Sequence, residues 1–337
     1  MIKLDGFADV GALAASLPTA DERARAEAGV RQDSLTKPAG SLGRLEELAV
    51  FLAGWHGCAQ PTIDLAQAII FAGNHGVCAQ GVSAFPQSVT AQMVANFEAG
   101  GAAVNQLCQV SGAELSVVAL DLETPTADFT QQTAMSAQEV MVALNQGMSA
   151  VRADGDVVIL GEMGIGNSTV AAALCAALFG GPIDQWVGRG TGADADAMAR
   201  KRAAITTGLA RHEAYLGEPL RILQAFGGRE QAAICGAIMA ARMHRIPVIL
   251  DGFICCAAAG VLHAIAPTFT EHCMVGHMSS ETGHRCLVEQ LDKRPLLELD
   301  MRLGEGSGAA LALSILRAAV ACHNGMKTFA EAAVSNR

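Results

Sequence analysis

Residues 157–179 read VVILGEMGIGNSTVAAALCAALF, and this stretch decides the fold class. The aliphatic and β-branched run 157–160 ends at a glycine, which is typical of a strand buried in a parallel sheet. A glycine-rich segment, 161–169, then leads into the apolar segment 170–179, which has the composition of a buried helix. Strand, glycine turn and helix in this order predict a βαβ arrangement.

Four further apolar runs, at 68–72, 115–120, 247–250 and 273–275, also end at a glycine or an aspartate. The stretches 89–109, 193–215 and 230–245 between them have helical periodicity. The sequence therefore predicts a Rossmann-like α/β fold, a parallel β-sheet flanked by helices on both faces. Residues 1–60 and 290–337 show helical patterning only, so we expect a smaller helical subdomain built from both termini beside an α/β nucleotide-binding catalytic domain at 61–289.

The composition argues against several classes of function. Of 337 residues, 51% are apolar and 17% charged, which indicates extensive burial. The net charge of −10 and the lack of a basic stripe argue against a nucleic-acid partner, but one phosphorylated small molecule needs only a local positive site. No apolar segment reaches the ~18 residues of a membrane span. The ten scattered cysteines and the lack of a secretory signal predict reduced thiols and a cytoplasmic location.

Functional side chains of an open parallel sheet gather at the carboxyl ends of its strands. Six polar residues follow or end the predicted strands: Asn74, His75, Asp121, Glu162, Asp251 and His277. We expect them along one rim of the sheet. His75 fits either a general acid or base or a buried, hydrogen-bonded loop residue.

Two glycine loops are candidate anion sites. In the loop 161–169, backbone amides at a helix start and the hydroxyls of Ser168 and Thr169 would cradle a phosphate, although a capped strand-to-helix turn is the alternative. The glycine order is wrong for a dinucleotide fingerprint, and no G-K-[ST] follows for a Walker loop. Lys201, after the second loop at 187–192, either reaches a phosphate or is simply solvated.

The segment Arg302–Gly308 places Glu305 among three glycines, just before the apolar run 309–316. The carboxylate is either a helix-start charge, worth ~0.3–1 kcal/mol, or a general base facing a cavity. His272, Cys273, His277, Glu281 and His284 lie close in sequence, but no tight ligand spacing is present. We therefore expect neither a metal nor another cofactor.

Seven segments together resemble the nicotinate-nucleotide:dimethylbenzimidazole phosphoribosyltransferase (CobT) family. They occur in the order in which the family has them, between residues 35 and 313, and the first and last are the most specific. They are LTKPAGSLGRLEELA (35–49), AGNHGVCAQGVSAFPQSVT (72–90), GEMGIGNST (161–169), VGRG (187–190), PVILDGF (247–253), GHMSSETGH (276–284) and RLGEGSGAALAL (302–313).

The resemblance implies an enzyme that moves the 5-phosphoribosyl group of nicotinate mononucleotide to an imidazole nitrogen of a benzimidazole base, with inversion at the anomeric carbon. It implies Glu305 as general base and Glu162 as a second catalytic acid that positions ribose or substrate. It also implies small-molecule substrates and a homodimer. The implied substrate contacts are Met163, Gly164, Gly166, Asn167, Ser168, Thr169, Gly188, Gly190, Lys201, Ser279 and Leu303.

The chain departs from parts of the family at three positions. Where another branch has polar residues near the base pocket, this chain has Phe85 and Met93. Glu305 is then the main polar contact for the acceptor base, and we expect no narrow acceptor selectivity. Asn74 stands where many relatives carry Asp, so we assign it no charge-dependent role.

Two other classes stay open at this point. The glycine loops on a parallel sheet also fit a Rossmann-type nucleotide-dependent oxidoreductase, which tight dinucleotide binding and hydride transfer would reveal. A non-catalytic protein that binds nucleotides or benzimidazoles would bind both ligands without forming product.

Overall fold

The computed structural model describes residues 3–190, 192 and 194–335, and these form one five-stranded parallel sheet in the order β2-β1-β3-β4-β5. The strands are β1 (Ala66–Ala72), β2 (Ala113–Ala119), β3 (Val157–Met163), β4 (Val248–Leu250) and β5 (Cys273–Val275). Strands β1, β3 and β5 contain the whole apolar run from which we predicted them, whereas β2 ends one residue before the end of its run (115–120) and β4 begins one residue after the start of its run (247–250). The parallel α/β fold is confirmed.

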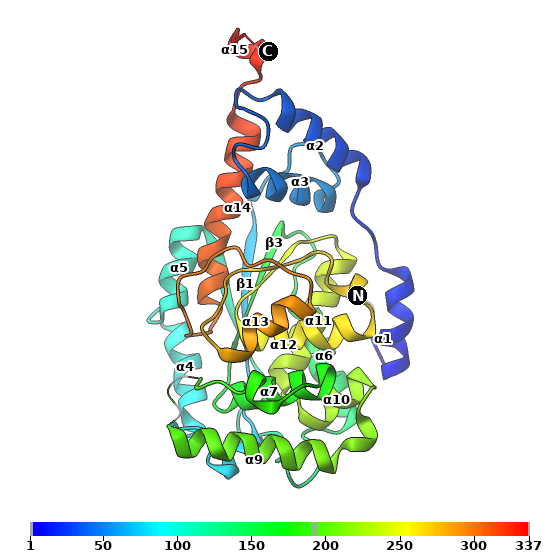
Figure 1. Ribbon diagram of the computed structural model, residues 1–337, viewed down its shortest axis with the longest axis vertical. Coiled ribbons are helices and arrows are strands. Elements are labelled where there is room, and N and C mark those ends of the chain that lie inside the picture. Colours follow the sequence, from blue (N-terminus) through cyan, green and yellow to red (C-terminus); the bar gives the residue numbers. More distant parts are fainter. Residues whose placement is uncertain (1–2, 191, 193, 336–337) are drawn as a thin grey trace.

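Helices account for most of the remaining described chain (Figure 1). The α-helices are α1 (Phe7–Leu13), α2 (Glu22–Ser34), α3 (Arg44–His56), α4 (Ser88–Glu98), α5 (Ala103–Ser111), α6 (Ala137–Ala150), α7 (Asn167–Phe179), α8 (Ile183–Trp186), α9 (Ala195–Arg211), α10 (Pro219–Phe226), α11 (Arg229–Met243), α12 (Phe253–Ile265), α13 (Thr282–Gln290), α14 (Ser307–Gly325) and α15 (Phe329–Ala332). Short 3-10 helices are η1 (Ala14–Ser16), η2 (Gly76–Gln80), η3 (Glu213–Tyr215) and η4 (Pro267–Thr270).

Each face of the sheet has its own hydrophobic core, because successive side chains of a strand point to opposite faces. Phe71, Leu160 and Leu250 belong to the core shared with α6, α7 and α10–α12. Ile70 and Ile159 belong to the other core, which α3, α5 and α14 complete. The helices therefore cover both faces, and only the strand ends are left for a site.

The segments before β1 and after β5 contribute helices but no strand to the sheet. Helix α3 packs against α2 and α14, and these three form the narrow upper part of the molecule in Figure 1. The amino-terminal part of α14 instead reaches the sheet and contacts β3, β4 and α5. Helix α1 lies apart from α2 and α3 (Figure 1), and the backbone of Leu4 is hydrogen-bonded to the Asn145 side chain on α6. The division into a terminal helical subdomain and a catalytic domain stays a prediction.

The stretch 89–109, predicted as continuously helical, is two helices instead. Helix α4 ends at Glu98 and α5 begins at Ala103. Gly100 between them has φ +79°, and a Cβ on Gly101 would lie 2.2 Å from Oδ1 of Asn96. A left-handed residue ends an α-helix, and here glycine provides it. The first residue of the predicted helix 193–215 lies outside the described residues; α9 and η3 cover most of the rest.

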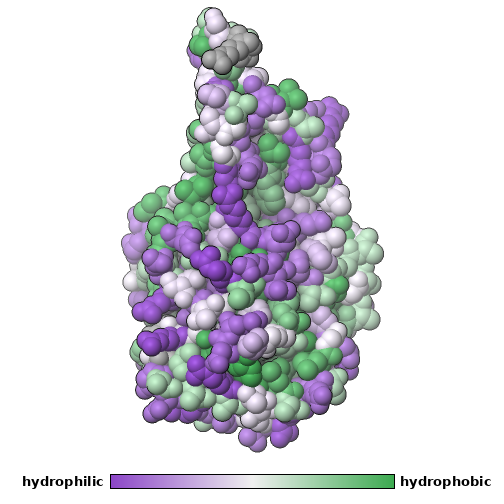
Figure 2. Space-filling model, in the orientation of Figure 1, coloured by the Kyte–Doolittle hydropathy of each residue, from purple (hydrophilic) through white to green (hydrophobic). Residues whose placement is uncertain are grey.

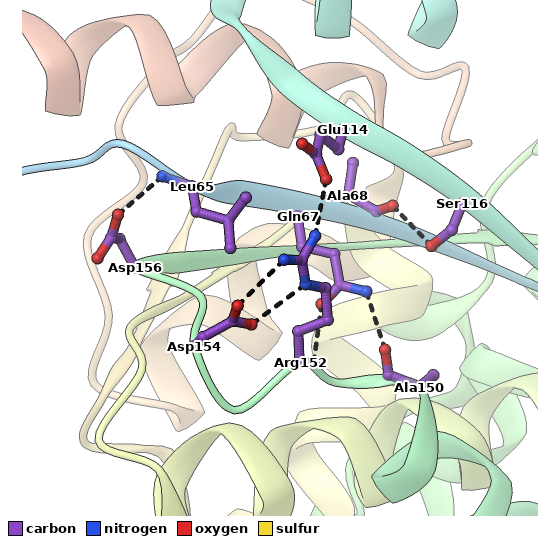
Figure 3. A network of polar contacts seen from close by, with 9 residues as sticks. All are labelled: Leu65, Gln67, Ala68, Glu114, Ser116, Ala150, Arg152, Asp154 and Asp156. Atoms are coloured by element: carbon purple, nitrogen blue, oxygen red, sulfur yellow. Dashed lines mark hydrogen bonds and ion pairs between the residues drawn. The ribbon is translucent and has the colours of Figure 1, made fainter.

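Polar contacts hold the amino-terminal edge of the sheet (Figure 3). Oδ2 of Asp156 accepts the backbone N–H groups of Asp64 (2.7 Å) and Leu65 (2.8 Å), which joins the entries of β1 and β3. The guanidinium of Arg152 contacts both Asp154 and Glu114. This edge is therefore tied together by polar groups at the end of the sheet opposite the candidate rim.

The surface shows no dominant apolar region on the face seen in Figure 2, where polar and apolar residues alternate in small patches. In the described part of the chain, none of the helices combines the length and apolar character that crossing a membrane requires.

Candidate active site

A cavity of about 320 Å³ opens above the carboxyl ends of the strands. Its walls come from the segments after β1, β3, β4 and β5 and from the turn before α14. Strand order reverses between β1 and β3, since the chain goes from β1 outward to β2 and then returns to β3 on the other side. Ligands of open α/β sheets bind at such a switch point, so fold and cavity agree on the location.

Glu305 lies in a turn of left-handed residues at the entrance to α14. Gly304, Glu305 and Gly306 have φ of 82°, 63° and 78°. The Glu305 side chain lines the cavity and the residue is 8% exposed. Burial, together with the nearby negative charge of Asp251, raises the pKa of Glu305 to about 7. A carboxylate with that pKa is a stronger base than an exposed one and is still ionised in part at neutral pH.

Glu162, near the end of β3, lines the same cavity and is 4% exposed. Burial raises its pKa to about 8, and the charges of Asp251, Glu230 and Glu305 add to the effect. Asn167 Nδ2 donates a hydrogen bond to Oε2 of Glu162. At neutral pH Glu162 is mostly protonated, so it can donate a hydrogen bond to a ligand oxygen while Glu305 accepts a proton.

The glycine loop after β3 forms one end of the cavity. Gly166 precedes α7 with φ 92°, and the loop from Gly164 to Ser168 lines the wall. Nζ of Lys201 donates to Oγ of Ser168 and to the carbonyl oxygen of Gly188, both at 3.0 Å. Amides at a helix start and a buried ammonium group favour an anion, so this end suits a phosphate.

The wall formed by the segment after β1 is apolar. Val82, Phe85, Val89 and Met93 present apolar side chains to the cavity. Phe85 is 48% exposed. Leu303, on the turn that carries Glu305, is 47% exposed and also lines the cavity. An aromatic ligand bound here would cover both. The cavity thus has a polar wall, where Lys201 lies near the carboxyl group of Glu281, and a separate apolar wall.

The structure brings nearly all predicted site residues to this one cavity. Those that line it are Phe85, Met93, Glu162, Met163, Gly164, Gly166, Asn167, Ser168, Gly190, Lys201, Ser279, Leu303 and Glu305. Thr169 and Gly188 lie outside the wall. The Thr169 side chain is fully buried within α7, and a Cβ on Gly188 would lie 2.2 Å from Oε2 of Glu281, which occupies that place.

Of the six rim residues, Glu162 and His277 line the cavity, and Asp251 lies buried beside the turn of Glu305. Asn74, His75 and Asp121 do not line it. Nδ2 of Asn74 donates to the Leu122 carbonyl. His75 is fully buried, and its Nε2 lies 2.9 Å from Oε1 of Glu230. These residues support the loops around the site.

Two charged residues of the wall were missed as ligand contacts: Arg189 and Glu281. Arg189 lies between Gly188 and Gly190 of the second glycine loop, which was a usable signal. Glu281 had been weighed only as a metal ligand. Burial raises its pKa, while the ammonium group of Lys201 opposes the shift.

The histidines considered for a metal make other contacts. Nε2 of His272 lies 3.0 Å from the Ile238 carbonyl oxygen. Nδ1 of His284 accepts the backbone N–H of Ser279, and burial lowers the pKa of His284 to about 3. Across residues 3–190, 192 and 194–335, no three His, Cys, Asp or Glu side chains gather as a metal site would need.

Comparison with known proteins agrees with this arrangement. The profile of a family described as phosphoribosyltransferase matches residues 17–334. The nicotinate-nucleotide–dimethylbenzimidazole phosphoribosyltransferase of Rhodobacter capsulatus is 58% identical over 335 residues, 99% of this chain and 100% of the relative. That of Roseobacter denitrificans is 58% identical over 321 residues, 95% of each chain.

Solved structures agree as well. The crystal structure of CobT from Thermus thermophilus superimposes with a TM-score of 0.88 at 41% identity, over 94% of this chain and 100% of that one. Sequence and structure thus match over nearly the whole length of the chain. The chain belongs to the phosphoribosyltransferase family that contains the nicotinate-nucleotide–dimethylbenzimidazole phosphoribosyltransferases.

Proposed function

We propose that this enzyme transfers the 5-phosphoribosyl group from nicotinate mononucleotide to 5,6-dimethylbenzimidazole, giving α-ribazole 5′-phosphate and nicotinate for the nucleotide loop of cobalamin. The observation that carries the proposal is the position of Glu305. Its carboxylate lines the same cavity as an apolar wall that fits a benzimidazole and a glycine loop with a lysine that fits a phosphate.

The donor binds with its 5-phosphate at the loop 164–168. The α7 amino terminus and the ammonium group of Lys201 supply the positive potential there. Glu162, mostly protonated at neutral pH, is placed to hold a ribose hydroxyl or the donor base. These contacts fix the anomeric carbon in the middle of the cavity, which saves the entropy of bringing two reactants together.

The acceptor binds against Phe85, Val89 and Met93 with its N–H directed at Glu305. Glu305 takes this proton, which raises the electron density of the imidazole ring. The other ring nitrogen forms the new bond to the anomeric carbon. The bond from that carbon to the pyridinium nitrogen breaks, and its electron pair leaves with nicotinate. Attack from the face opposite the leaving group inverts the configuration.

The apolar wall shapes the choice of acceptor. A ring with methyl groups buries them against Phe85 and Met93, whereas a base with extra polar groups leaves those groups without a partner there. We further propose that the enzyme is a cytoplasmic homodimer that needs no cofactor. The dinucleotide oxidoreductase is set aside because the glycine order does not match and the family is a transferase family.

The test is to incubate the enzyme with nicotinate mononucleotide and 5,6-dimethylbenzimidazole, and to follow nicotinate and the α-nucleotide by chromatography. Glu305→Gln should lower kcat by ~10²–10⁴-fold, the usual contribution of a general base. The variant should still bind the donor, measured by calorimetry. Glu114 is exposed at the other end of the sheet, so Glu114→Gln should have the kcat and the donor affinity of the wild type. Full turnover by Glu305→Gln would remove Glu305 from the mechanism.

A further inference from the structure

Asp251 directly follows β4 and is fully buried. Both of its carboxylate oxygens accept backbone N–H groups from the start of α14. Oδ2 accepts from Gly306 at 3.0 Å, and Oδ1 accepts from Ala309 at 2.9 Å. The N–H of Gly306 belongs to the peptide bond that follows Glu305. Asp251 therefore holds the backbone right beside the candidate base.

This backbone needs to be held. Glu305 adopts φ 63° between two glycines that also have positive φ. For a residue with a Cβ, the left-handed conformation costs ~1–2 kcal/mol and persists where the surroundings impose it. Gly161 of β3 presses on one side of the turn, since a Cβ there would lie 2.6 Å from the nitrogen of Gly306. Asp251 fastens the turn through hydrogen bonds.

A second contact ties the same carboxylate to the cavity wall. Nε2 of His277, which follows β5, lies 3.5 Å from Oδ1 of Asp251. His277 in turn packs against the start of α14, because a Cβ on Gly308 would lie 2.0 Å from its Cδ2. Asp251, at the end of β4, thus contacts both His277 after β5 and the first turn of α14. It does not itself line the cavity.

We propose that Asp251 is the positioning residue for Glu305: its two hydrogen bonds to Gly306 and Ala309 set the turn that aims the Glu305 carboxylate at the acceptor base. This inference rests on the proposed function, in which Glu305 takes the acceptor proton. Asp251 acts through Glu305 and touches neither substrate.

Electrostatics supports the assignment. After burial, the negative charge of Asp251 is the next cause that raises the pKa of Glu305. For Glu162 too, the charge of Asp251 is the largest cause of the raised pKa after burial. Besides Glu305, the titratable groups around this carboxylate are Glu162 of β3, Cys255 and Cys256 of α12, and His277 after β5. Removal of the charge at position 251 therefore lowers the pKa of Glu305 and makes it a weaker base.

The test is Asp251→Asn, which keeps the shape of the side chain but turns an NH₂ group toward one of the two N–H donors. Loss of alignment should lower kcat by ~10²-fold, as an ~1 Å displacement does. KM for nicotinate mononucleotide should change much less than kcat, because Asp251 affects the donor side only through the pKa of Glu162. The acidic limb of the kcat–pH profile should move to lower pH. In the double variant with Glu305→Gln, Asp251→Asn should cause no further loss, because it acts through residue 305.

Asp156→Asn is the matched control. Asp156 also accepts two backbone N–H groups, but at the amino-terminal edge of the sheet (Figure 3). It should lower the melting temperature without changing kcat or the pH profile. If Asp251→Asn does not fold, Asp251→Ser, whose small side chain leaves room for a water, replaces it with the same expectations.

The outcomes separate the two proposals. An unchanged kcat and pH profile in Asp251→Asn would refute the positioning role, as would a further loss in the double variant. Failure of both Asp251 variants to fold would show that the carboxylate serves the fold itself, which also refutes it. Absence of nicotinate release and α-nucleotide formation by the wild-type enzyme would refute the proposed function instead.

Discussion

Gly161→Ala tests how closely the turn of Glu305 is fitted to the sheet. A Cβ added at residue 161 would lie 2.6 Å from N and 2.7 Å from Cα of Gly306, and 2.9 Å from the carbonyl carbon of Glu305. All three atoms are backbone, so no side chain can rotate away. To reach the 3.4 Å of an ordinary contact, the turn has to move by about 0.8 Å.

A displacement of this size falls on the residue that removes the acceptor proton. We expect kcat to drop by ~10²-fold, since an ~1 Å misplacement of a reacting group costs about that much. Overpacking should also lower the free energy of unfolding by ~1–3 kcal/mol. KM for nicotinate mononucleotide should change little, because the phosphate loop is not in contact with the added methyl group.

The assay is steady-state nicotinate release with the donor and 5,6-dimethylbenzimidazole, accompanied by urea unfolding. Gly155→Ala is the control. It lies just before the same strand, and the nearest atom to an added Cβ there is the Arg152 carbonyl oxygen at 3.4 Å. It should match the wild type in both measurements. If Gly161→Ala also kept the wild-type kcat, the turn would not be held against β3 as we describe.

Two further predictions concern the ionised groups of the site. The pKa of Glu162 is about 8 in the folded enzyme, against 4.5 for an ordinary glutamate, so its contribution to stability is present below pH 4.5 and is lost as the pH rises through 8. The side chain in Glu162→Gln stays neutral at every pH. Between pH 4.5 and 8, the free energy of unfolding of this variant, measured with urea, should therefore rise relative to that of the wild type by about 1.4 kcal/mol per pH unit. If the two free energies of unfolding kept a constant difference over this range, the raised pKa of Glu162 would be contradicted. Lys201→Met removes the buried ammonium from the phosphate end and should raise KM for nicotinate mononucleotide by ~10–100-fold, the equivalent of a charged hydrogen bond, with a smaller effect on kcat. Exposed Lys327→Met is its control in the same kinetic assay, and an equal KM in the two variants would place the phosphate elsewhere.

Local sequence patterns were enough to locate the strands. The runs at 157–160 and 273–275 are aliphatic and end at glycine, and a strand buried on both faces needs little beyond that. The same reasoning failed at residues 99–102, where glycines end one helix and a second one begins. The adjacent Gly100 and Gly101 were a usable signal for this break, because paired glycines mark turns, but the prediction rested on apolar spacing alone.

The sequence also singled out Glu305, because this acid stands among three glycines before a predicted helix, whereas Glu162 was one of six expected rim residues and its catalytic role came from the family resemblance. Chain order says nothing about which distant segments meet. Arg189 and Glu281 come from separate loops and reach the cavity only when β3 and β5 lie in one sheet. That these two side chains share one wall followed from the structure alone.

The sequence by itself determined the α/β class, the strand positions and the glycine-rich segments that carry Glu162 and Glu305, since these depend on composition over a few neighbouring residues. Tertiary structure decided the chemical state of those acids. Both pKa values are raised mainly by burial and then by Asp251, which comes from a different strand end. Burial and Coulomb energy depend on distances through space, and a carboxyl group acquires its basicity only when the sheet and α14 have closed around it.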